Sequence, residues 1–307
     1  MDEEKKERNP LLPESDKLHN ENDSNENSLN SKSEEKIIEI SDKETEIFFF
    51  NFLGKKRRFP PYKDQNGFII SLIMILMGSL FYLIMLYLLL TKYDKERKII
   101  YLILLIITSI TLIITLFFLF IITTSIPGYQ TGEKITEKEF IQLSPTKTIN
   151  NKIFILKYCN TCHLIRDIRT FHCKICGICI ERHDHHCSFI SNCIGKKNHK
   201  LFFFFLIILF IHLIPIVCVD GYIFMIITDL EKKLDDKKNI ITITLLAGIT
   251  IVFAGFFLCF SITMIITHIQ LISNNQVSNE IIRKKDDNKD VFNKGCCGNW
   301  KEVFCDN

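Results

Sequence analysis

The chain has 307 residues, of which 47% are hydrophobic, and 38 basic residues nearly balance 35 acidic ones to give a formal net charge of +3. A charge so close to zero gives no sign of nucleic-acid binding, and no nucleic-acid partner is expected. The hydrophobic residues are gathered in four long blocks, which one soluble domain of this size could not bury. The sequence therefore excludes an ordinary soluble enzyme and predicts a membrane protein.

The part of the chain before the first hydrophobic block changes character along its length. Residues 1–47 are rich in Glu, Asn, Ser, Lys and Asp, a composition typical of a disordered tail. Residues 48–67 combine aromatic side chains with four consecutive cations, Lys55 to Arg58, as expected for a juxtamembrane segment at an anionic surface. Because a charged tail precedes the first block, that block is not expected to be a cleaved signal peptide.

Four hydrophobic blocks are predicted to be transmembrane helices, at residues 68–90, 99–124, 201–225 and 241–267. The first has no charge in 23 residues, which is enough to cross about 30 Å of hydrocarbon. Lys and Arg are more numerous beside the first block and in segment 127–200 than in the two short loops between blocks, residues 91–98 and 229–239. The positive-inside rule therefore places both termini, segment 127–200 and the tail 268–307 in the cytosol.

The third predicted helix contains two ionisable residues, His212 and Asp220. An ionisable group at membrane depth is by default a functional hypothesis. Asp220, however, lies close to the far interface, and a structural or interfacial role is expected for both. Pro215 lies between them and is expected to kink the helix.

Seven of the 12 cysteines fall between residues 159 and 193, interspersed with histidines. Disulfides are unfavourable in the cytosol, so Cys and His at two-residue spacings indicate zinc, which takes four N or S ligands. Eight ligands would make two closed sites, and the segment holds more than eight Cys and His. At least one cysteine therefore stays unligated, although spacing alone leaves open which residues share an ion and which cysteine is free.

This segment includes RHDHHCSFISNC, Arg182 to Cys193, and resembles the DHHC-type protein S-acyltransferases. The resemblance covers residues 68–307. It implies an all-α polytopic membrane protein with four transmembrane helices and a cytosolic cysteine-rich domain of short β-hairpins, 127–200, between helices two and three. It also implies two structural zinc ions in interleaved sites. The first site would be Cys159, Cys162, His172 and Cys179, and the second Cys173, Cys176, His186 and Cys193.

The resemblance leaves Asp184, His185 and Cys187 for chemistry. Only a few per cent of an ordinary cysteine is thiolate at neutral pH, so an imidazole that takes its proton makes it a nucleophile. A carboxylate in turn orients that imidazole. Cys187 is therefore expected to be the nucleophile, His185 the general base and Asp184 the residue that orients it. The implied reaction transfers a fatty acyl group, such as palmitoyl, from acyl-CoA through Cys187 to cysteines of membrane-associated proteins.

Other parts of the sequence carry weaker matches. Candidates to bind the CoA phosphates are Arg166, Arg169, Lys196 and Lys197, although a cationic face on anionic lipid explains them equally well. Supporting residues implied by the family's minor motifs are Asn198, Ser278, Glu280 and Asn299. Two departures are Ser188-Phe189 in place of Pro-Trp and Asp167-Ile168 in place of Pro-Pro. The details lean to the branch with plant and Ras-palmitoylating enzymes, so Ras-like GTPases and an accessory subunit are conceivable partners.

Three rival functions remain open from the sequence. A catalytically inactive zinc-binding scaffold of the same family would keep the ligands and tolerate loss of Cys187, which this chain retains. A membrane-anchored RING-like ubiquitin ligase would need a longer spacer between ligand pairs. A transporter would carry more intramembrane charge. The expected location is an endomembrane, Golgi or ER above all, or the plasma membrane.

Overall fold

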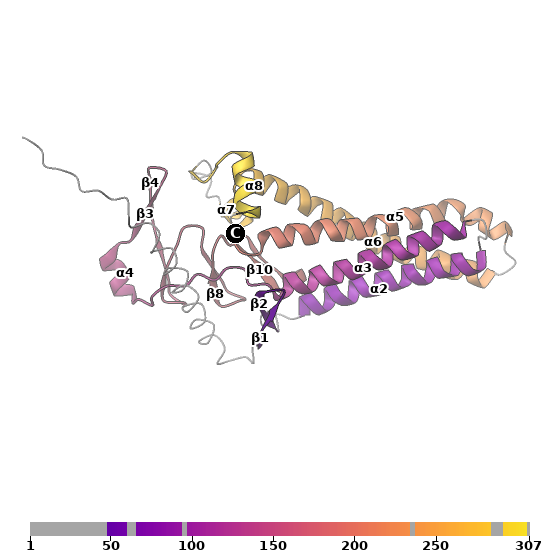
Figure 1. Cartoon of the computed structure of the whole chain (residues 1–307), viewed down its shortest axis with the longest axis horizontal. Helices are drawn as coiled ribbons and strands as arrows, with labels where there is room; N and C mark the ends of the chain where they lie inside the picture. The colour runs from indigo at the N-terminus through magenta and orange to yellow at the C-terminus, as the bar shows by residue number, and fades with distance from the viewer. Residues whose placement is uncertain (1–47, 60–65, 94–96, 234–236, 284–290, 306–307) are drawn as a thin grey trace, which may run out of the picture. The chain divides into compact units, whose positions relative to one another are not determined.

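The computed structural model describes residues 48–59, 66–93, 97–233, 237–283 and 291–305. The predicted tail 1–47 lies outside these ranges. Four long helices dominate the described chain: α2 (Asn66–Leu88, continued by the π-helical turn Leu89–Tyr93), α3 (Lys98–Thr124), α5 (His199–Lys233) and α6 (Lys237–Ser273). They run alongside one another as a bundle (Figure 1).

All four helices are long and apolar enough to cross a membrane, over Asn66–Thr91, Lys98–Thr124, His199–Met225 and Ile240–Ser273. Their outward faces carry exposed large side chains such as Ile106 and Val252, as expected for contact with lipid. Their inward faces bury a core that includes Tyr82, Leu119 and Phe205. The predicted fold class is confirmed: a helical multi-pass protein with short β-hairpins between the second and third membrane helices.

The segment between α3 and α5 contains one short helix and four antiparallel hairpins. The helix is α4 (Glu137–Leu143), which begins with a capping box at Thr136. The hairpins are β3–β4 (Thr146–Ile149, Lys152–Ile155), β5–β6 (Lys157–Cys159, Leu164–Arg166), β7–β8 (Phe171–Cys173, Ile178–Ile180) and β9–β10 (His185–Cys187, Asn192–Ile194). Each hairpin is too short for a core of its own, so other interactions must hold the segment together.

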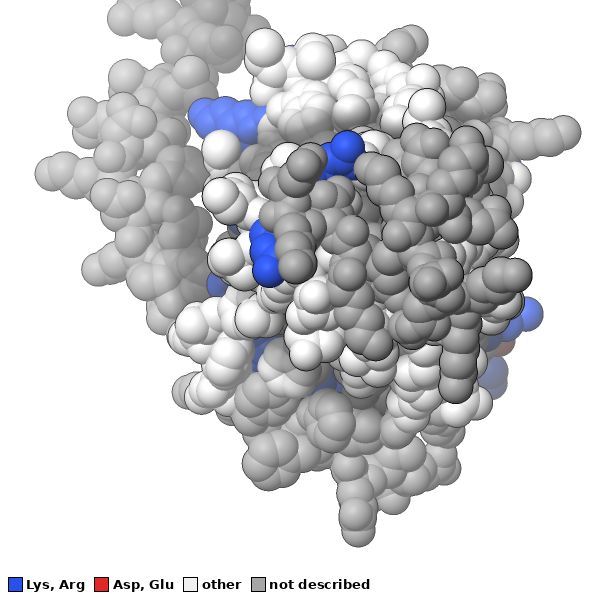
Figure 2. Space-filling view, turned by 90° about the vertical axis from the view of Figure 1, so that its right-hand side faces the viewer, with Lys and Arg blue, Asp and Glu red and all other residues white. Residues whose placement is uncertain are grey.

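Three further elements flank the bundle near the hairpins (Figure 1). They are the hairpin β1–β2 (Phe48–Phe52, Lys55–Phe59), helix α7 (Ser278–Ile282) and helix α8 (Cys296–Phe304). The opposite end of the bundle faces the viewer in Figure 2, where the described surface is mostly uncharged with a few scattered Lys and Arg.

Hydrogen bonds from Asn192 and from Arg57 attach two of the hairpins to the end of α3. The amide nitrogen of Asn192 donates to the carbonyls of Ile122, Thr123 and Ser125 at 3.0, 3.2 and 2.8 Å. Arg57 of β2 donates to the carbonyl of Ile121 at 2.7 Å. The last carbonyls of a helix have no partner within the helix, so these bonds both satisfy them and fix the hairpins against the bundle.

Candidate functional site

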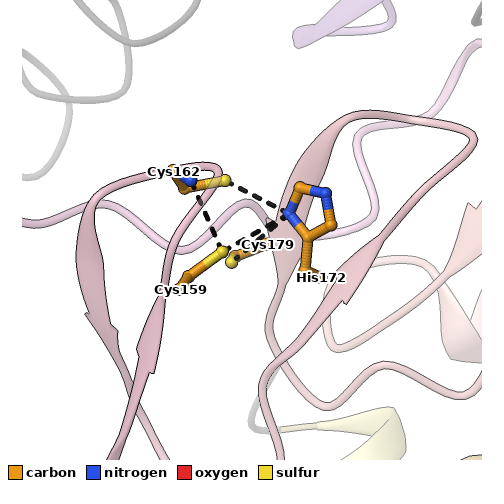
Figure 3. Close-up of side chains that lie close together, drawn as sticks. All are labelled: Cys159, Cys162, His172 and Cys179. Carbon is orange, nitrogen blue, oxygen red and sulfur yellow. Dashed lines mark hydrogen bonds between the residues drawn. The ribbon is translucent and has the colours of Figure 1, made fainter.

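Four predicted ligands from two neighbouring hairpins, Cys159, Cys162, His172 and Cys179, converge on one point (Figure 3). Their ligand atoms all lie within 4.8 Å of one another. His172 Nδ1 is 3.6, 3.3 and 3.9 Å from the sulfurs of Cys159, Cys162 and Cys179. The first two cysteines come from the β5–β6 hairpin, whereas His172 and Cys179 are paired across β7 and β8.

The second cluster repeats this arrangement one hairpin further along the chain. Cys173 and Cys176 come from β7 and the turn that follows it, while His186 and Cys193 are paired across β9 and β10. His186 Nδ1 is 3.7, 3.4 and 3.5 Å from the sulfurs of Cys173, Cys176 and Cys193. The hairpin β7–β8 thus contributes to both clusters, which links three hairpins in series.

The geometry of both clusters fits zinc. A tetrahedral ion with its usual bond lengths separates sulfur and nitrogen ligands by about 3.5 Å, close to the distances above. In both clusters the amide of the second cysteine also donates to the sulfur of the first, with N···Sγ distances of 3.4 Å. Three thiols and one imidazole are a donor set that zinc prefers. Each cluster could therefore hold one metal ion.

Asp184, His185 and Cys187 lie beside the second cluster, and the structure brings all three together. His185 Nδ1 is 2.6 Å from Asp184 Oδ2, and the imidazole also interacts with Cys187. Asp184 is 1% exposed, whereas His185 and Cys187 are half-buried. Cys187 packs against the hydrophobic core of the helix bundle. The three side chains thus meet where the hairpin β9–β10 joins the helix bundle.

The electrostatics favour a charged pair. Burial alone would lower the pKa of His185, but the hydrogen bonds and charges of Asp184 and Cys187 raise it to about 10. Burial likewise opposes ionisation of Asp184, yet the bond from His185 and nearby histidines hold the pKa of this carboxyl below its ordinary value. Asp184 therefore stays ionised, and His185 is a strong proton acceptor.

The chain after α6 holds the residues that precede Cys187. Asp184 Oδ1 accepts from the backbone amide of Ser278 at 2.6 Å, and Oδ2 accepts from the Ser278 hydroxyl at 3.1 Å. The neighbouring Asn279 donates to His183 Nδ1 at 2.9 Å. The predicted supporting residue Ser278 is therefore in direct contact with the carboxylate that orients His185.

The chain is similar to known proteins. Residues 152–285 match the model of the family described as "DHHC palmitoyltransferase". This chain carries a DHHC-family domain. The chain is 34% identical over 169 residues to "Probable protein S-acyltransferase 6" of Arabidopsis thaliana, 33% identical over 172 residues to "Probable protein S-acyltransferase 5" of the same plant, and 32% identical over 151 residues to human "Palmitoyltransferase ZDHHC8".

These matches cover 51%, 52% and 49% of this chain, but only 38%, 33% and 19% of the three relatives. The chain thus spans well under half the length of the curated relatives it matches. Residues 152–285, which match the family model, contain both cysteine clusters and the Asp-His-His-Cys motif.

Hydrogen bonds of Asn275 connect the DHHC domain with helix α8. The Asn275 side-chain oxygen accepts from Arg182 at 2.8 Å and from Arg169 at 2.9 Å, and its nitrogen donates to Glu302 of α8 at 2.9 Å. Arg182 itself pairs with Glu302 at 3.2 Å. Asn275 begins the minor motif that supplied the predicted supporting residues Ser278 and Glu280, but it was not itself predicted as a site residue; its φ of 48° is one that Asn tolerates.

Two buried histidines behind His185 were also missed by sequence reasoning. His199 begins α5 and His268 lies near the end of α6, and their rings are joined by a 3.0 Å contact between Nε2 and Nδ1. The ring of Phe202 lies edge-on to both His185 and His268, with centroids 5.6 and 5.2 Å apart. This aromatic wall confines the imidazole of His185 on the side of the bundle.

The residues after Cys187 form a 3₁₀ turn, Ser188–Ile190, which is in direct contact with α2. The Ser71 hydroxyl donates to the carbonyl of Phe189 at 2.6 Å, and the amide of Phe68 donates to the hydroxyl of Ser191 at 2.8 Å. A Cβ on Gly67 would lie 1.6 Å from the Ser188 carbonyl oxygen. These contacts restrict the turn at Ser188, where the family resemblance led us to expect a proline.

Gly67→Ala is expected to slow acylation of Cys187 by about 100-fold or more. The new methyl group must push α2 away from the turn, and a displacement of about 1 Å at a reacting group costs about that much. The measurement is the rate of acyl incorporation from labelled acyl-CoA. Gly255→Ala on α6, where nothing lies within 4 Å, is the matched control. An unchanged rate in Gly67→Ala would show that the close approach does not position the nucleophile.

The four cations predicted to contact CoA fall in two places. Arg166 and Arg169 line a cleft of about 150 Å³, with Lys157 and Arg283. Arg169 is already engaged, because its guanidinium makes four hydrogen bonds to Glu280 and Asn275. Arg166 Nε is buried with no hydrogen-bond partner among the described residues.

The remaining two cations lie in the turn before α5. Lys196 pairs with Glu181 at 3.6 Å, and both Lys196 and Lys197 have side-chain atoms beside Gly128. They do not line the cleft of Arg166. Lys196 is half-exposed in its pair, so it offers a surface charge rather than a built anion site.

The other predicted supporting residues, Asn198, Glu280 and Asn299, form hydrogen bonds between separate elements of the fold. Asn198 donates to the Ser125 hydroxyl at 3.0 Å and to the Cys193 carbonyl at 2.9 Å, joining the second cluster to α3 and α5. Glu280 takes both of its ion-pair bonds from Arg169. The fully buried Asn299 donates to the carbonyl of Ser273 at 2.7 Å and so fastens α8 to the end of α6.

An apolar cavity of about 30 Å³ lies inside the bundle below the DHHC motif. Phe189, two residues after Cys187, lines it together with Gly78, Ser79 and Ala254. Its floor includes His212, whose ring nitrogens lie 3.0 Å from the hydroxyls of Ser79 and Thr111. These bonds satisfy both nitrogens of His212 inside the membrane, in agreement with a structural role.

Proposed function

We propose that this chain is a protein S-acyltransferase that carries a fatty acyl group on Cys187. The observation that carries the proposal is the alignment of Asp184, His185 and Cys187 above an apolar cavity in a membrane bundle. A nucleophile placed at the cytosolic surface can meet a soluble acyl donor while the acyl chain enters the bundle. The names of the relatives, two probable protein S-acyltransferases and a palmitoyltransferase, agree with this proposal.

In the first half-reaction, the imidazole of His185 holds the proton that the Cys187 thiol has given up, and its other nitrogen keeps donating to Asp184. The thiolate attacks the thioester carbonyl of acyl-CoA. The carbon–sulfur bond to CoA then breaks, and the CoA thiolate takes the proton from His185. One thioester is formed for each one broken, so the step needs no energy source.

In the second half-reaction, the thiol of a substrate protein gives its proton to His185 and attacks the acyl-Cys187 thioester. Cys187 leaves as a thiolate and regains a proton from His185. The acceptors would be cysteines of membrane-associated proteins, because the site lies where the hairpins meet the bundle. Ras-like GTPases are one substrate class to assay, and an accessory subunit is one variable to include.

Two zinc ions would have a structural part in this function. When bound, they would cross-link the hairpins that carry the eight ligands and leave no open coordination position for chemistry. His186 would bind metal while its neighbours His185 and Cys187 act on substrate. The unligated cysteine left over from the two sites is therefore the proposed nucleophile.

The donor would bind with its phosphates toward cations and its chain in the cavity. Arg166, Lys157 and Arg283 line the cleft beside the hairpins and are better suited than Arg169, whose donors are engaged. The cavity is narrow, so an acyl chain would have to part the side chains of α2, α5 and α6. We place this side of the bundle in the cytosol of an endomembrane or plasma membrane, following the distribution of Lys and Arg.

Ala254→Leu is expected to shift the preference of the enzyme toward shorter acyl chains. The larger side chain fills the cavity, and each methylene that no longer fits changes relative rates by about tenfold or more. Competition between labelled lauroyl-, myristoyl- and palmitoyl-CoA measures the shift. Val252→Leu, on the same helix but 74% exposed, is the control that should leave the preference unchanged. Equal preferences in both variants would remove the cavity from the proposal.

The proposal is tested with purified wild type and Cys187→Ser in detergent, with labelled palmitoyl-CoA. Hydroxylamine-sensitive label on wild type alone, with equal zinc in both, would support Cys187 as the acylated residue. Equal label on both would point to Cys296, Cys297 or Cys305, which are exposed. No label on wild type, with zinc intact, would favour the inactive scaffold.

A further inference from the structure

His183 is a buried histidine that belongs to neither cysteine cluster and takes no part in the proposed reaction. It immediately precedes Asp184, and its exposed fraction is 7%. Its Nε2 lies 3.4 Å from the sulfur of Cys193, a predicted ligand of the second cluster that is itself fully buried. Buried polar groups are almost always hydrogen-bonded, so the neighbours of the ring decide which nitrogen carries the proton.

Two side chains of the segment around α7 fix the tautomer of His183. Arg283 Nε donates to Asn279 Oδ1 at 2.6 Å. A guanidinium can only donate, so this bond identifies the oxygen side of the Asn279 amide. The amide nitrogen therefore faces His183, whose Nδ1 lies 2.9 Å away and must accept. The proton of the imidazole then lies on Nε2, the nitrogen next to the sulfur of Cys193.

We propose that His183 donates a hydrogen bond from Nε2 to the thiolate of Cys193 when the second cluster holds zinc, and that this bond slows the loss of the ion. Three thiolates and a neutral imidazole leave a zinc site with one net negative charge. Because Cys193 is buried, an N–H at its sulfur offsets that charge in place of water. Groups that hydrogen-bond to metal ligands contribute about 10–100-fold to metal affinity. This role requires zinc in the second cluster, as proposed above, but it does not require acyl transfer.

The first cluster provides a comparison within the same chain. Cys179 is paired with His172 across β7–β8, just as Cys193 is paired with His186 across β9–β10. Among the histidines of the described chain, only the ligand His172 is hydrogen-bonded to the sulfurs of the first cluster. The two zinc ions are therefore expected to differ. Loss of the bond from His183 should affect one ion, and the other is an internal control.

The test measures transfer of zinc from the purified full chain, in detergent, to an excess of a coloured pyridylazo-resorcinol chelator. In His183→Phe, which keeps a ring but has no N–H, one of the two zinc ions is expected to leave about 10–100-fold faster than in the wild type. The other ion should leave at the wild-type rate. His183→Gln, whose amide can place an N–H near the position of Nε2, is expected to restore most of the slow release. This rescue distinguishes a hydrogen bond from the filling of space.

Asn279→Leu gives a second variant should His183→Phe fail to fold. It removes the donor that fixes the tautomer, so the same ion is expected to leave faster than in the wild type. His212→Phe is the matched control, because it removes a buried imidazole that is bonded to Ser79 and Thr111 inside the bundle, and both ions should leave at wild-type rates. Equal release from wild type and His183→Phe would overturn the proposal, as would equal acceleration of both ions. A wild type that holds no zinc would overturn the metal sites as well.

Discussion

Asp184→Asn is expected to lower the rate of Cys187 acylation by about 10³- to 10⁴-fold. Asp184 accepts from Nδ1 of His185 and so leaves the other ring nitrogen free to receive the proton of Cys187. An amide in this place can present a donor to Nδ1, which favours the wrong tautomer; loss of an orienting carboxylate in a catalytic triad has an effect of this size. The rate is measured as burst release of CoA from saturating palmitoyl-CoA.

The matched control is Asp167→Asn, which removes an exposed carboxylate paired with Lys147 in the same domain. Its rate should stay close to that of the wild type, since exposed ion pairs contribute little. Zinc content and melting temperature separate a loss of chemistry from a loss of folding. A fall of less than about tenfold in Asp184→Asn, with zinc retained, would mean that Asp184 anchors Ser278 but does not direct His185.

Hydropathy was enough to predict the membrane architecture. Each of the four spans is a long apolar block, with Asp220 of the third as its single charged residue, and the membrane allows such a block only one regular structure, the helix. The structure places these helices where the blocks are, although α6 continues to Ser273, beyond the predicted end at residue 267. The polar residues His268 and Gln270 end the apolar block in sequence, whereas the helix continues past them and packs Ile272 against Val303 of α8.

The residues of the site itself could be predicted from the sequence, whereas the residues that hold them in place could not. The eight clustered ligands and the Asp184, His185 and Cys187 group come from one short segment, so a resemblance in sequence could name them all. The residues that hold this segment come from distant parts of the chain. Gly67 and His268 touch the site only after the bundle forms, and nothing next to them in sequence marks that contact.

The candidates for CoA binding illustrate the same limit. Arg166 and Arg169 have the same charge and are three residues apart, so the sequence treats them alike. In the fold, Arg169 forms an ion pair with Glu280, which lies more than one hundred residues away in the sequence. Arg166 Nε has no hydrogen-bond partner among the described residues. Which cation is available to a ligand depends on such long-range partners, and these are fixed only in three dimensions.

Removal of a single cluster ligand is expected to have the largest effect on stability. Cys176→Ser should lower the zinc content from about two ions per chain to about one, and Cys162→Ser should do the same through the other cluster. A structural zinc contributes about 10–16 kcal/mol in small domains, more than the net stability of most proteins. Both variants should therefore lose the fold of the hairpin segment, since the short hairpins have no core to replace the ion.

Cys259→Ser is the matched control, because this cysteine is exposed on α6 and belongs to neither cluster. Zinc per chain and protease resistance of segment 152–200 are read from the same samples. The two variants should differ in their effect on acylation. The cluster of Cys176 contains His186, which is paired with Cys193 across the hairpin that carries Cys187. Its loss should abolish acylation outright. Two zinc ions retained in either variant would show that the clusters do not bind metal as the geometry indicates.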